Sequence, residues 1–339
     1  MKKKFILPLV NAHTHAAMVG FRGTAEDLPL QRWLDERIFP AERKQADRSF
    51  VYEQTKAAIK EMRRNGIEVF SDMYFFEDEV ARAAEELKMK VVIGEGLLEF
   101  PTPSIKTPQK ALEITEEFLN KYKGSEYVSV AVAPHSIYTV SADNLLKAKK
   151  LSRKYGAIYH IHLAETKMEF EECLKKNKAT PVGFLERLGV LDDKTVLIHC
   201  VWLTDKDIEI LAKRKVNVVH CPLSNLKLGS GVAPVAKMLE QGITVALGTD
   251  GAASSNRLDI WEAGKIASLL QKGISNDPTK IPAKEAVKMM TVNGLKALGI
   301  KEIRGKTIID IEKEWSDGGD YNFLYELNAE DIDFSRSVQ

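Results

Sequence analysis

Short runs of apolar residues alternate with longer segments of helical periodicity along most of the chain. In residues 50–62 and 145–151, for example, apolar side chains return every three or four positions, as one buried face of a helix requires. Ser141 and Thr204 are suited to begin helices, and Gly156 is placed to end one before the next apolar run. The apolar runs themselves predict eight strands, at residues 5–11, 67–73, 90–98, 127–134, 157–163, 195–201, 216–221 and 243–249.

Eight strand–helix repeats predict an α/β protein, and the arrangement they favour is a (β/α)8 TIM barrel over residues 1–300. The alternative is an open, doubly wound parallel sheet, but no glycine-rich nucleotide-binding loop follows any predicted strand. The repeat fades beyond the barrel region. There we expect a small, incomplete β appendage over 301–339, with a strand within 303–311, a turn at 315–320 and a strand at 321–327.

The composition is that of a soluble globular protein, with 44% hydrophobic and 29% charged residues among 339. Forty-nine basic and 48 acidic residues give a net charge of +1, which argues against nucleic acid or a membrane as a partner. No apolar run reaches the length of about 20 residues that spans a bilayer. Because three cysteines are too few for a disulfide framework, we expect a cytoplasmic protein.

All seven histidines of the chain fall within or directly after predicted strands, near their C-terminal ends. In a barrel these ends form the face where catalytic groups converge. Histidines with unrelated structural roles would not all be expected at strand ends, so the pattern predicts one functional site. Its members are His13 and His15 after the first strand, His135 after the fourth, His160 and His162 on the fifth, and His199 and His220 on the next two.

Four of the strand-end residues suit a catalytic metal site. His13 and His15 stand two positions apart, so an extended strand would turn both imidazoles to the same face. With His162 and Asp250 they offer three imidazoles and a carboxylate to one divalent ion. Zinc suits this set best, and iron, manganese and nickel accept the same donors. We favour a single metal because the fourth strand ends in His135, not in a bridging Lys or Glu.

A metal in such a site lowers the pKa of its bound water towards neutrality. Asp250 is placed to accept the proton of that water, and Glu165, three residues beyond His162, to pass it to the substrate. His199 is suited to orient the attacking oxygen or to polarise the group under attack. His160 is interpreted instead as a buried, hydrogen-bonded core residue.

Three further strand-end residues are expected to support the structure without binding the metal. His220 is expected beside the ligands and not among them. Cys200 and Cys221 alternate to the opposite face from the histidines that precede them, so we expect them in packing.

The motifs around these residues resemble those of the amidohydrolase superfamily, in the group of single-metal deaminases and chlorohydrolases that includes 5′-methylthioadenosine and S-adenosylhomocysteine deaminases. The resemblance extends over about residues 5–300, in family order. It is carried by VNAHTH at 10–15, FRGTAEDL at 21–28, Trp33-Leu34, APHS at 133–136, HIHLAET at 160–166, HCPLSNLKLGSG at 220–231 and GTDGAAS at 248–254.

The resemblance implies the same metal ligands and the same catalytic Glu165 and His199. It also implies a substrate shell in which Trp33 packs by the purine, Glu42 grips the ribose hydroxyls and His135 contacts the ribose. The expected reaction is hydrolytic deamination of an adenosine-type nucleoside, with the nucleoside as the only small-molecule partner. Alternatives are guanine or cytosine deamination, triazine chlorohydrolysis, or an inactive truncated or scaffold barrel.

Two departures from the family pattern lead to expectations of their own. Family members carry half of a small β-sandwich before the first barrel strand, whereas here the barrel begins close to Met1. Residues 303–327 would then leave strand edges unpaired, or pair them in a homo-oligomer. Glu95 occupies the place where relatives that act on S-adenosylhomocysteine can carry an arginine, which favours an uncharged 5′ substituent.

Overall fold

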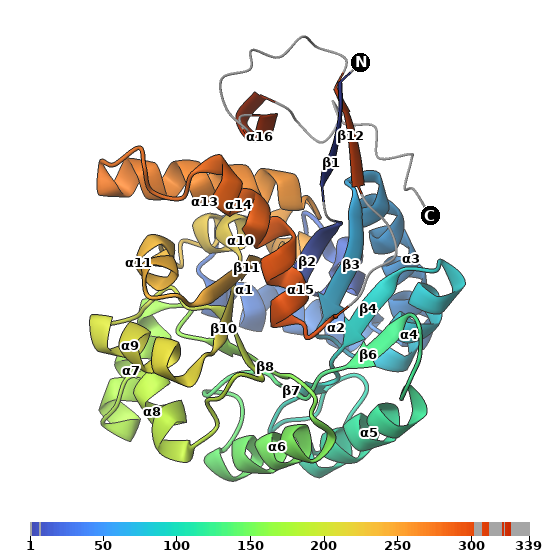
Figure 1. Cartoon of the computed structure of the whole chain (residues 1–339). Coiled ribbons are helices and arrows are strands. Elements are labelled where there is room, and N and C mark those ends of the chain that lie inside the picture. The colour runs from blue at the N-terminus through green and yellow to red at the C-terminus, as the bar shows by residue number, and fades with distance from the viewer. Residues whose placement is uncertain (1, 7, 302–306, 312–320, 322, 327–339) are drawn as a thin grey trace.

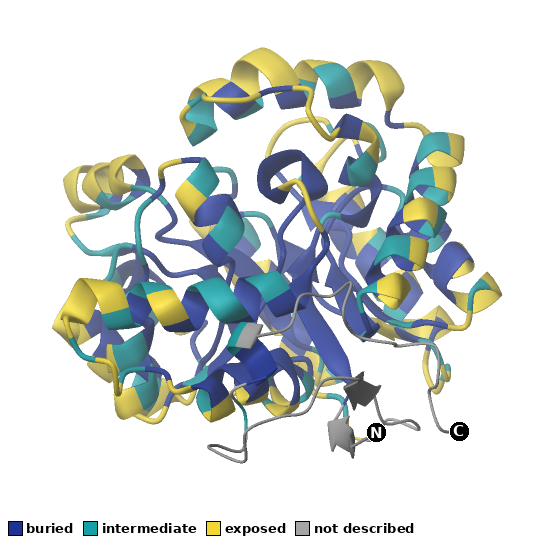
Figure 2. Ribbon diagram, turned by 90° about the horizontal axis from the view of Figure 1, so that it is seen from above, coloured by how far each residue is buried: buried dark blue, intermediate teal, exposed yellow. Residues whose placement is uncertain are grey.

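The computed structural model of the chain describes residues 2–6, 8–301, 307–311, 321 and 323–326. Parallel strands lie at its centre and helices surround them (Figure 1). Viewed from above, the central strands are buried, while the helices are buried on their inner sides and exposed on their outer sides (Figure 2). Within the described ranges, no helix combines the length and the apolar character needed to cross a membrane.

Two parallel four-stranded sheets supply most of the central strands. The first has the order β2 (Leu9–Thr14), β3 (Ile67–Asp72), β4 (Lys90–Ile93) and β6 (Val128–Val130). The second has the order β11 (Thr244–Leu247), β10 (Asn217–His220), β9 (Thr195–His199) and β8 (Tyr159–Leu163). A short parallel pair, β5 (Gly96–Leu97) with β7 (Ala133–Pro134), continues the lines of β4 and β6.

Hydrogen-bonded contacts link these sheets on both sides. Parallel bridges pair Val132 with Tyr159 and Ser136 with His162, beside β8. On the other side, the main-chain N–H of Asp250 donates to the carbonyl oxygen of His13 at 3.1 Å. The C-terminal ends of the strands are thereby brought to one region, and the arrangement is a TIM-barrel-like α/β fold.

The helices between the strands bury one face each. In α3 (Arg48–Arg64), for instance, the buried residues recur at helical spacing from Val51 to Met62. Ser141 caps α6 (Ala142–Tyr155), which ends at Gly156 with φ of 65°, and Thr204 forms a capping box on α9 (Asp205–Arg214), as predicted. The others are α1 (Leu30–Trp33), α2 (Phe39–Gln45), α4 (Glu77–Glu86), α5 (Pro108–Lys121), α7 (Lys167–Asn177), α8 (Pro181–Leu188), α10 (Pro222–Lys227), α11 (Val235–Glu240), α12 (Ala252–Ser255), α13 (Ile260–Ser275), α14 (Ala283–Met290) and α15 (Val292–Ala297), with a 3-10 turn at Ala16–Phe21 and a π turn at Leu34–Ile38.

The first predicted strand, 5–11, is wrong as a single element. The chain forms β1 (Lys2–Ile6), then passes Pro8, which lacks the N–H that a ladder needs, and begins β2. β1 pairs antiparallel with β12 (Thr307–Ile311), and the pair extends away from the central strands (Figure 1). One edge of β12 thus has a partner within the same chain.

The strand predicted at 321–327 is also wrong, because Phe323–Glu326 form the short helix α16. Phe323 and Leu324 are buried, and the Phe323 ring stacks on Trp261 of α13 at a centroid distance of 5.7 Å. Burial against a helix thus decides the local structure where the apolar pattern is ambiguous. The turn predicted at 315–320 lies outside the described residues.

Candidate active site

Three histidines and one aspartate meet at the C-terminal ends of β2, β8 and β11. The Nε2 atoms of His13 and His162 lie 3.1 Å apart. One Asp250 carboxylate oxygen, Oδ1, lies 3.2 Å from His15 Nε2 and 3.6 Å from His13 Nε2. His13, His162 and Asp250 are buried and His15 is half-buried. Their ligand atoms form two groups that share His13, one with His15 and Asp250 and one with His162 and His199, and within each group the atoms lie within 4.8 Å of one another.

A β-bulge in β2 helps to place the first two histidines. Asn11 pairs with Phe70 and Thr14 with Asp72, so β2 contains one residue more than β3 between these two pairs. The rings of His13 and His15 nevertheless come together, with centroids 4.9 Å apart, as predicted.

The Asn11 side chain fastens this part of β2 to the end of β11. Its amide nitrogen donates to Thr249 Oγ1 at 2.7 Å, and its oxygen accepts from the Thr249 main chain at 2.9 Å. His13 and Asp250 are thus held on two segments that are tied to each other directly.

The second nitrogens of two of these rings are engaged elsewhere. Nδ1 of His162 donates to the carbonyl oxygen of His135 at 2.9 Å, and Nδ1 of His15 donates to that of Met73. In each ring the Nε2 lone pair is then left for the centre of the cluster, which is the usual arrangement of metal-bound histidine. The residues present therefore fit a divalent cation.

The electrostatics of the cluster also suit a cation. Burial lowers the pKa of His13 to about 4 and that of His162 well below its usual value, so both rings are neutral. Burial opposes ionisation of Asp250 as well, but hydrogen bonds from His13 and His15 hold its pKa well below the usual range. At His15 burial is outweighed by Asp250, which raises the pKa to about 9. A bound cation would replace this proton.

Glu165 and His199 stand next to the four candidate ligands, after β8 and at the end of β9. Burial, assisted by the charge of Asp250, raises the pKa of Glu165 to about 8, whereas burial lowers that of His199 to about 4. Glu165 Oε2 lies 3.6 Å from His199 Nε2. The site therefore pairs a protonated carboxylic acid, Glu165, with an ionised carboxylate, Asp250, which is the division of roles that acid–base catalysis needs.

Three strand ends at the site carry left-handed backbone. The φ angles are 52° at Ala164, 72° at His199 and 62° at Asp250, although none of these residues is glycine. Such conformations cost about 1–3 kcal/mol each and persist only where surrounding contacts impose them. Here they turn the chain so that Glu165, His199 and Asp250 face one another.

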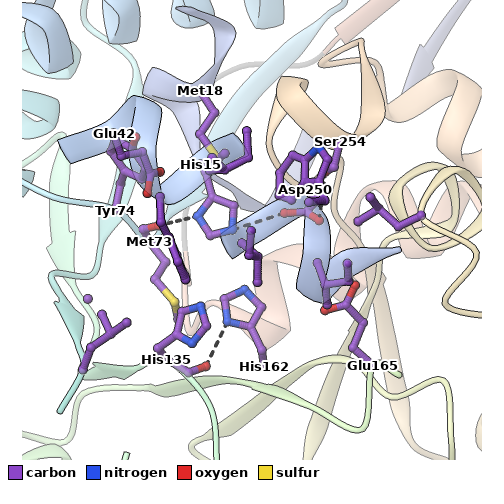
Figure 3. A pocket seen from close by; sticks show the side chains of 18 of the residues that line it. His15, Met18, Glu42, Met73, Tyr74, His135, His162, Glu165, Asp250 and Ser254 are labelled. Atoms are coloured by element: carbon purple, nitrogen blue, oxygen red, sulfur yellow. Dashed lines mark hydrogen bonds and ion pairs between the residues drawn. The ribbon is translucent and has the colours of Figure 1, made fainter. Parts of the chain in front are cut away.

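A pocket of about 750 Å³, including its opening to solvent, lies over these groups. His15, His162, Glu165 and Asp250 line its floor (Figure 3), and His199 is a further lining residue. Trp33, Glu42 and His135, the predicted substrate shell, line it as well, so every predicted site residue lines the pocket except His13, which is fully enclosed beneath it. Most other lining residues are apolar, and among the described residues no lysine or arginine lines the pocket: Met18, Leu30, Leu34, Ile38, Phe39, Met73, Tyr74, Phe75, Gly96, Leu98, Tyr138, Leu228 and Ser254.

Glu42 lies beside Tyr74, and Figure 3 shows the two on the opposite side of His15 from Glu165. Burial raises the pKa of Glu42 to about 7, against the opposing effect of the Tyr74 hydroxyl and the His15 charge. Tyr74 is itself 4% exposed. Nothing in its sequence context predicted its place, because it lies beyond β3 in an aromatic stretch typical of packing.

Glu95, which occupies the place of an arginine in some relatives, does not line the pocket. Its carboxylate accepts from the Glu77 main chain at 3.0 Å and from Ser104 Oγ at 2.5 Å. Gly96, the next residue, faces the pocket instead. The feature of the pocket that bears on the substrate is that no lysine or arginine occurs among its described lining residues.

The two histidines and two cysteines that were predicted to have structural roles are buried outside the pocket. His160 is buried below His13, with ring centroids 5.1 Å apart and Nδ1 3.5 Å from Ser71 Oγ, in line with the core role predicted for it. His220 is buried and lies outside the pocket lining. Cys200 and Cys221 are fully buried, as expected for packing residues.

Several residues that hold the site together were not predicted. Glu169 accepts from the main-chain N–H groups of Ala164 and Glu165, each at 2.9 Å, and so fixes the turn that presents Glu165. Its signal was available, since Thr166-x-x-Glu169 is a capping-box pattern at the start of α7. Ser224, Asn225 and Ser230 donate hydrogen bonds to Asp250, His199 and Glu165, and they lie in a motif whose residues were given no individual role from the sequence.

The sequence matches the model of the amidohydrolase family over residues 5–305. The chain belongs to the amidohydrolase family. Among its amidohydrolase relatives is the 5-methylthioadenosine/S-adenosylhomocysteine deaminase of Thermodesulfovibrio yellowstonii, 48% identical over 86% of this chain and 67% of the relative. The 5′-deoxyadenosine deaminase of Methanothermobacter thermautotrophicus is 44% identical over 88% of this chain and 70% of the relative.

Solved amidohydrolase structures share the fold. An adenosine deaminase from Xanthomonas campestris with bound zinc has a TM-score of 0.94 and 31% identity, over 97% of this chain and 78% of the other. An atrazine chlorohydrolase from Arthrobacter aurescens, complexed with zinc, has a TM-score of 0.87 at 20% identity, over 95% of this chain and 78% of the other. The zinc of the first structure supports a divalent metal in this chain, and the second structure shows the shared fold.

Proposed function

We propose that this amidohydrolase deaminates adenosine-type nucleosides that carry an uncharged 5′ group, such as 5′-methylthioadenosine, to the inosine analogue and ammonia. The observation that carries the proposal is the pocket itself. A cluster of cation-binding side chains and a protonated Glu165 lie at its floor, while Glu42 and apolar side chains line its wall. The names of the similar proteins, deaminases of 5′-substituted adenosines, support the same reaction.

We infer that the eight central strands form one closed ring, with the β1–β12 pair outside it. The parallel bridges beside β8 and the hydrogen bond between Asp250 and His13 support this closure. We further propose that His13, His15, His162 and Asp250 hold one zinc ion at the C-terminal face of the ring. When bound, zinc lowers the pKa of water, so that a hydroxide nucleophile is available near neutral pH.

Three side chains of the protein, those of Glu165, Asp250 and His199, then carry out the proton transfers and orient the attacking oxygen. Glu165, which holds a proton near neutral pH, gives it to N1 of the purine. The resulting carboxylate then takes the proton of the hydroxyl group that has been added to C6 and passes it to the departing ammonia. Asp250 remains ionised and accepts a proton from the attacking water. His199, neutral and 3.6 Å from Glu165, donates a hydrogen bond to the attacking oxygen and fixes its direction.

The wall of the pocket selects the rest of the substrate. The Trp33 ring offers an apolar face to the purine, and Glu42 and His135 offer polar atoms to the ribose hydroxyls. A carboxylate on the 5′ substituent would be desolvated without a positive partner, because no lysine or arginine lines the described pocket. We therefore expect a methylthio or hydrogen substituent to be preferred over homocysteine.

The test is ammonia release by the zinc-loaded protein from 5′-methylthioadenosine, S-adenosylhomocysteine, adenosine, guanine and cytosine. We expect kcat/KM to be highest for 5′-methylthioadenosine and lowest for the free bases. Turnover of guanine or cytosine alone would replace the nucleoside assignment by a base deaminase. If the zinc-loaded protein releases ammonia from none of the five compounds, the deaminase assignment is contradicted altogether.

A further inference from the structure

One segment of the chain, residues 224–230, contacts three groups of the site. Ser224 Oγ donates to Asp250 Oδ2 at 2.6 Å. The side-chain amide nitrogen of Asn225, Nδ2, donates to His199 Nδ1 at 2.9 Å. Ser230 Oγ donates to Glu165 Oε1 at 3.2 Å. The three donors are almost fully enclosed, with exposures of 0%, 1% and 5%, so these hydrogen bonds are made away from bulk water.

Hydrogen bonds hold segment 224–230 to the neighbouring backbone. It begins in α10, which follows β10 directly and has Pro222 at its first position. The main-chain N–H of Asn225 donates to Cys221, and that of Ser230 donates back to Asn225 at 2.8 Å. The indole N–H of Trp202 donates to the Ser230 carbonyl at 2.8 Å. Segment 224–230 therefore has little freedom to move independently of the strands.

We propose that segment 224–230 is a positioning element for the catalytic groups, and that Asn225 within it holds the ring proton of His199 on Nε2. The inference rests on the proposed function, because it concerns how that site is kept ready. It assigns a role to a motif whose residues lie outside the ligand and acid–base sets.

The hydrogen bond between Asn225 and His199 determines which nitrogen of the His199 ring carries the proton. An amide nitrogen donates and cannot accept, so the His199 nitrogen that faces it must present its lone pair. In a neutral imidazole the proton then resides on the other nitrogen, Nε2, which faces Glu165 across 3.6 Å. From there His199 donates a hydrogen bond to the attacking oxygen, whereas the other tautomer would present a lone pair and repel it.

Ser224 and Ser230 act in the same way on the two carboxyl groups. Ser224 occupies Oδ2 of Asp250, which leaves Oδ1 towards His13 and His15. Ser230 occupies Oε1 of Glu165, which leaves Oε2 towards His199. The segment thus contributes one donor to each carboxyl group, and at Asp250 it acts together with Ser254 Oγ, 3.3 Å from Oδ2, and the Gly251 N–H, 2.9 Å from Oδ1.

The first experiment is the substitution Asn225→Asp, which keeps the shape of the side chain but can only accept a hydrogen bond. The introduced carboxylate would draw the proton of His199 to Nδ1. With 5′-methylthioadenosine we expect kcat to fall by about 10²–10³, the cost of one lost transition-state donor, while KM and zinc content stay close to wild type. Asn217→Asp is the matched control, since Asn217 is a buried asparagine at the opposite end of β10 that donates to the Asp193 carbonyl. We expect that control to keep its kcat.

A kcat of at least half the wild-type value in Asn225→Asp would overturn the proposal, because an acceptor would then serve as well as the amide donor. A second measurement does not depend on how the variant folds. ¹⁵N–¹H correlation spectra of the zinc-loaded wild-type protein report the tautomer of each histidine, and the His199 signals are those missing in His199→Asn. We expect protonated Nε2 at His199, and protonated Nδ1 would overturn the assignment.

Ser224→Ala and Ser230→Ala test the rest of the segment. We expect Ser224→Ala to lose zinc faster to a chelator, and Ser230→Ala to lower kcat at unchanged KM. Wild-type behaviour of both would overturn the positioning role of the segment. Failure of the proposed function is recognised separately, because a wild-type protein without deaminase activity would still give the histidine spectra.

Discussion

Replacing Gly248 by Ala is the most direct test of how β2 and β11 hold the proposed metal site. Gly248 follows β11, and its N–H donates to the His220 carbonyl at 3.0 Å. A Cβ atom at this position would lie 2.9 Å from both the Cβ and the carbonyl oxygen of His13, and 3.0 Å from Cys221 Sγ. Two of these atoms move only with the backbone of β2, so no side-chain rotation can relieve the contact.

The size of the effect follows from these distances. Ordinary contacts of a Cβ atom begin at 3.4 Å, so the two segments must separate by about 0.5 Å. Metal sites tolerate deviations of only about 0.2 Å in ligand distances, and His13 and Asp250 lie on the two segments that are pushed apart. We expect a loss of about 1–3 kcal/mol in the free energy of unfolding of the zinc-free protein. Zinc affinity is expected to fall about 10- to 100-fold.

Zinc affinity is measured by competition with a chelator, and stability by thermal unfolding with and without zinc. Gly273→Ala in α13 is the matched control, because a Cβ atom there meets nothing within 4 Å. The control should be neutral or gain about 0.5–1 kcal/mol from the higher helix propensity of alanine. If Gly248→Ala matches wild type in both measurements, the close approach of the two strands does not control the site.

Three further predictions concern single groups of the site. Glu165→Gln should keep zinc yet lose about 10²–10⁴ in kcat, because the amide cannot transfer a proton; wild-type turnover would remove Glu165 from the mechanism. His162→Ala should lose zinc on dialysis, and full occupancy by metal analysis would contradict the ligand set. The pKa of Glu42 is raised to about 7, so its carboxylate, the better acceptor for ribose hydroxyls, forms as pH rises through 7. KM for nucleosides should fall over that range in wild type, and Glu42→Gln should show no such fall.

The sequence by itself determined the frame of this protein. Alternating apolar runs and helical periodicity are local properties, and they predicted the order of central strands and helices from β2 to β11. Because parallel strands present their C-terminal ends together, strand-end residues such as His13, His162 and Asp250 could be expected at one site before any contact was known. The chemistry of imidazole and carboxylate then pointed to a divalent cation.

The tertiary structure decided what depends on contacts between distant parts of the chain. Local alternation did not predict the left-handed turn at His199, the hydrogen bond of Asn225 to its ring, or the burial that raises the pKa of Glu165 to about 8. The pairing of β1 with β12 and the helix at Phe323–Glu326 are likewise set by partners far away in sequence. A periodicity shows which face of an element is buried. Only the assembled structure shows what it is buried against, and that neighbour fixes protonation, orientation and reactivity.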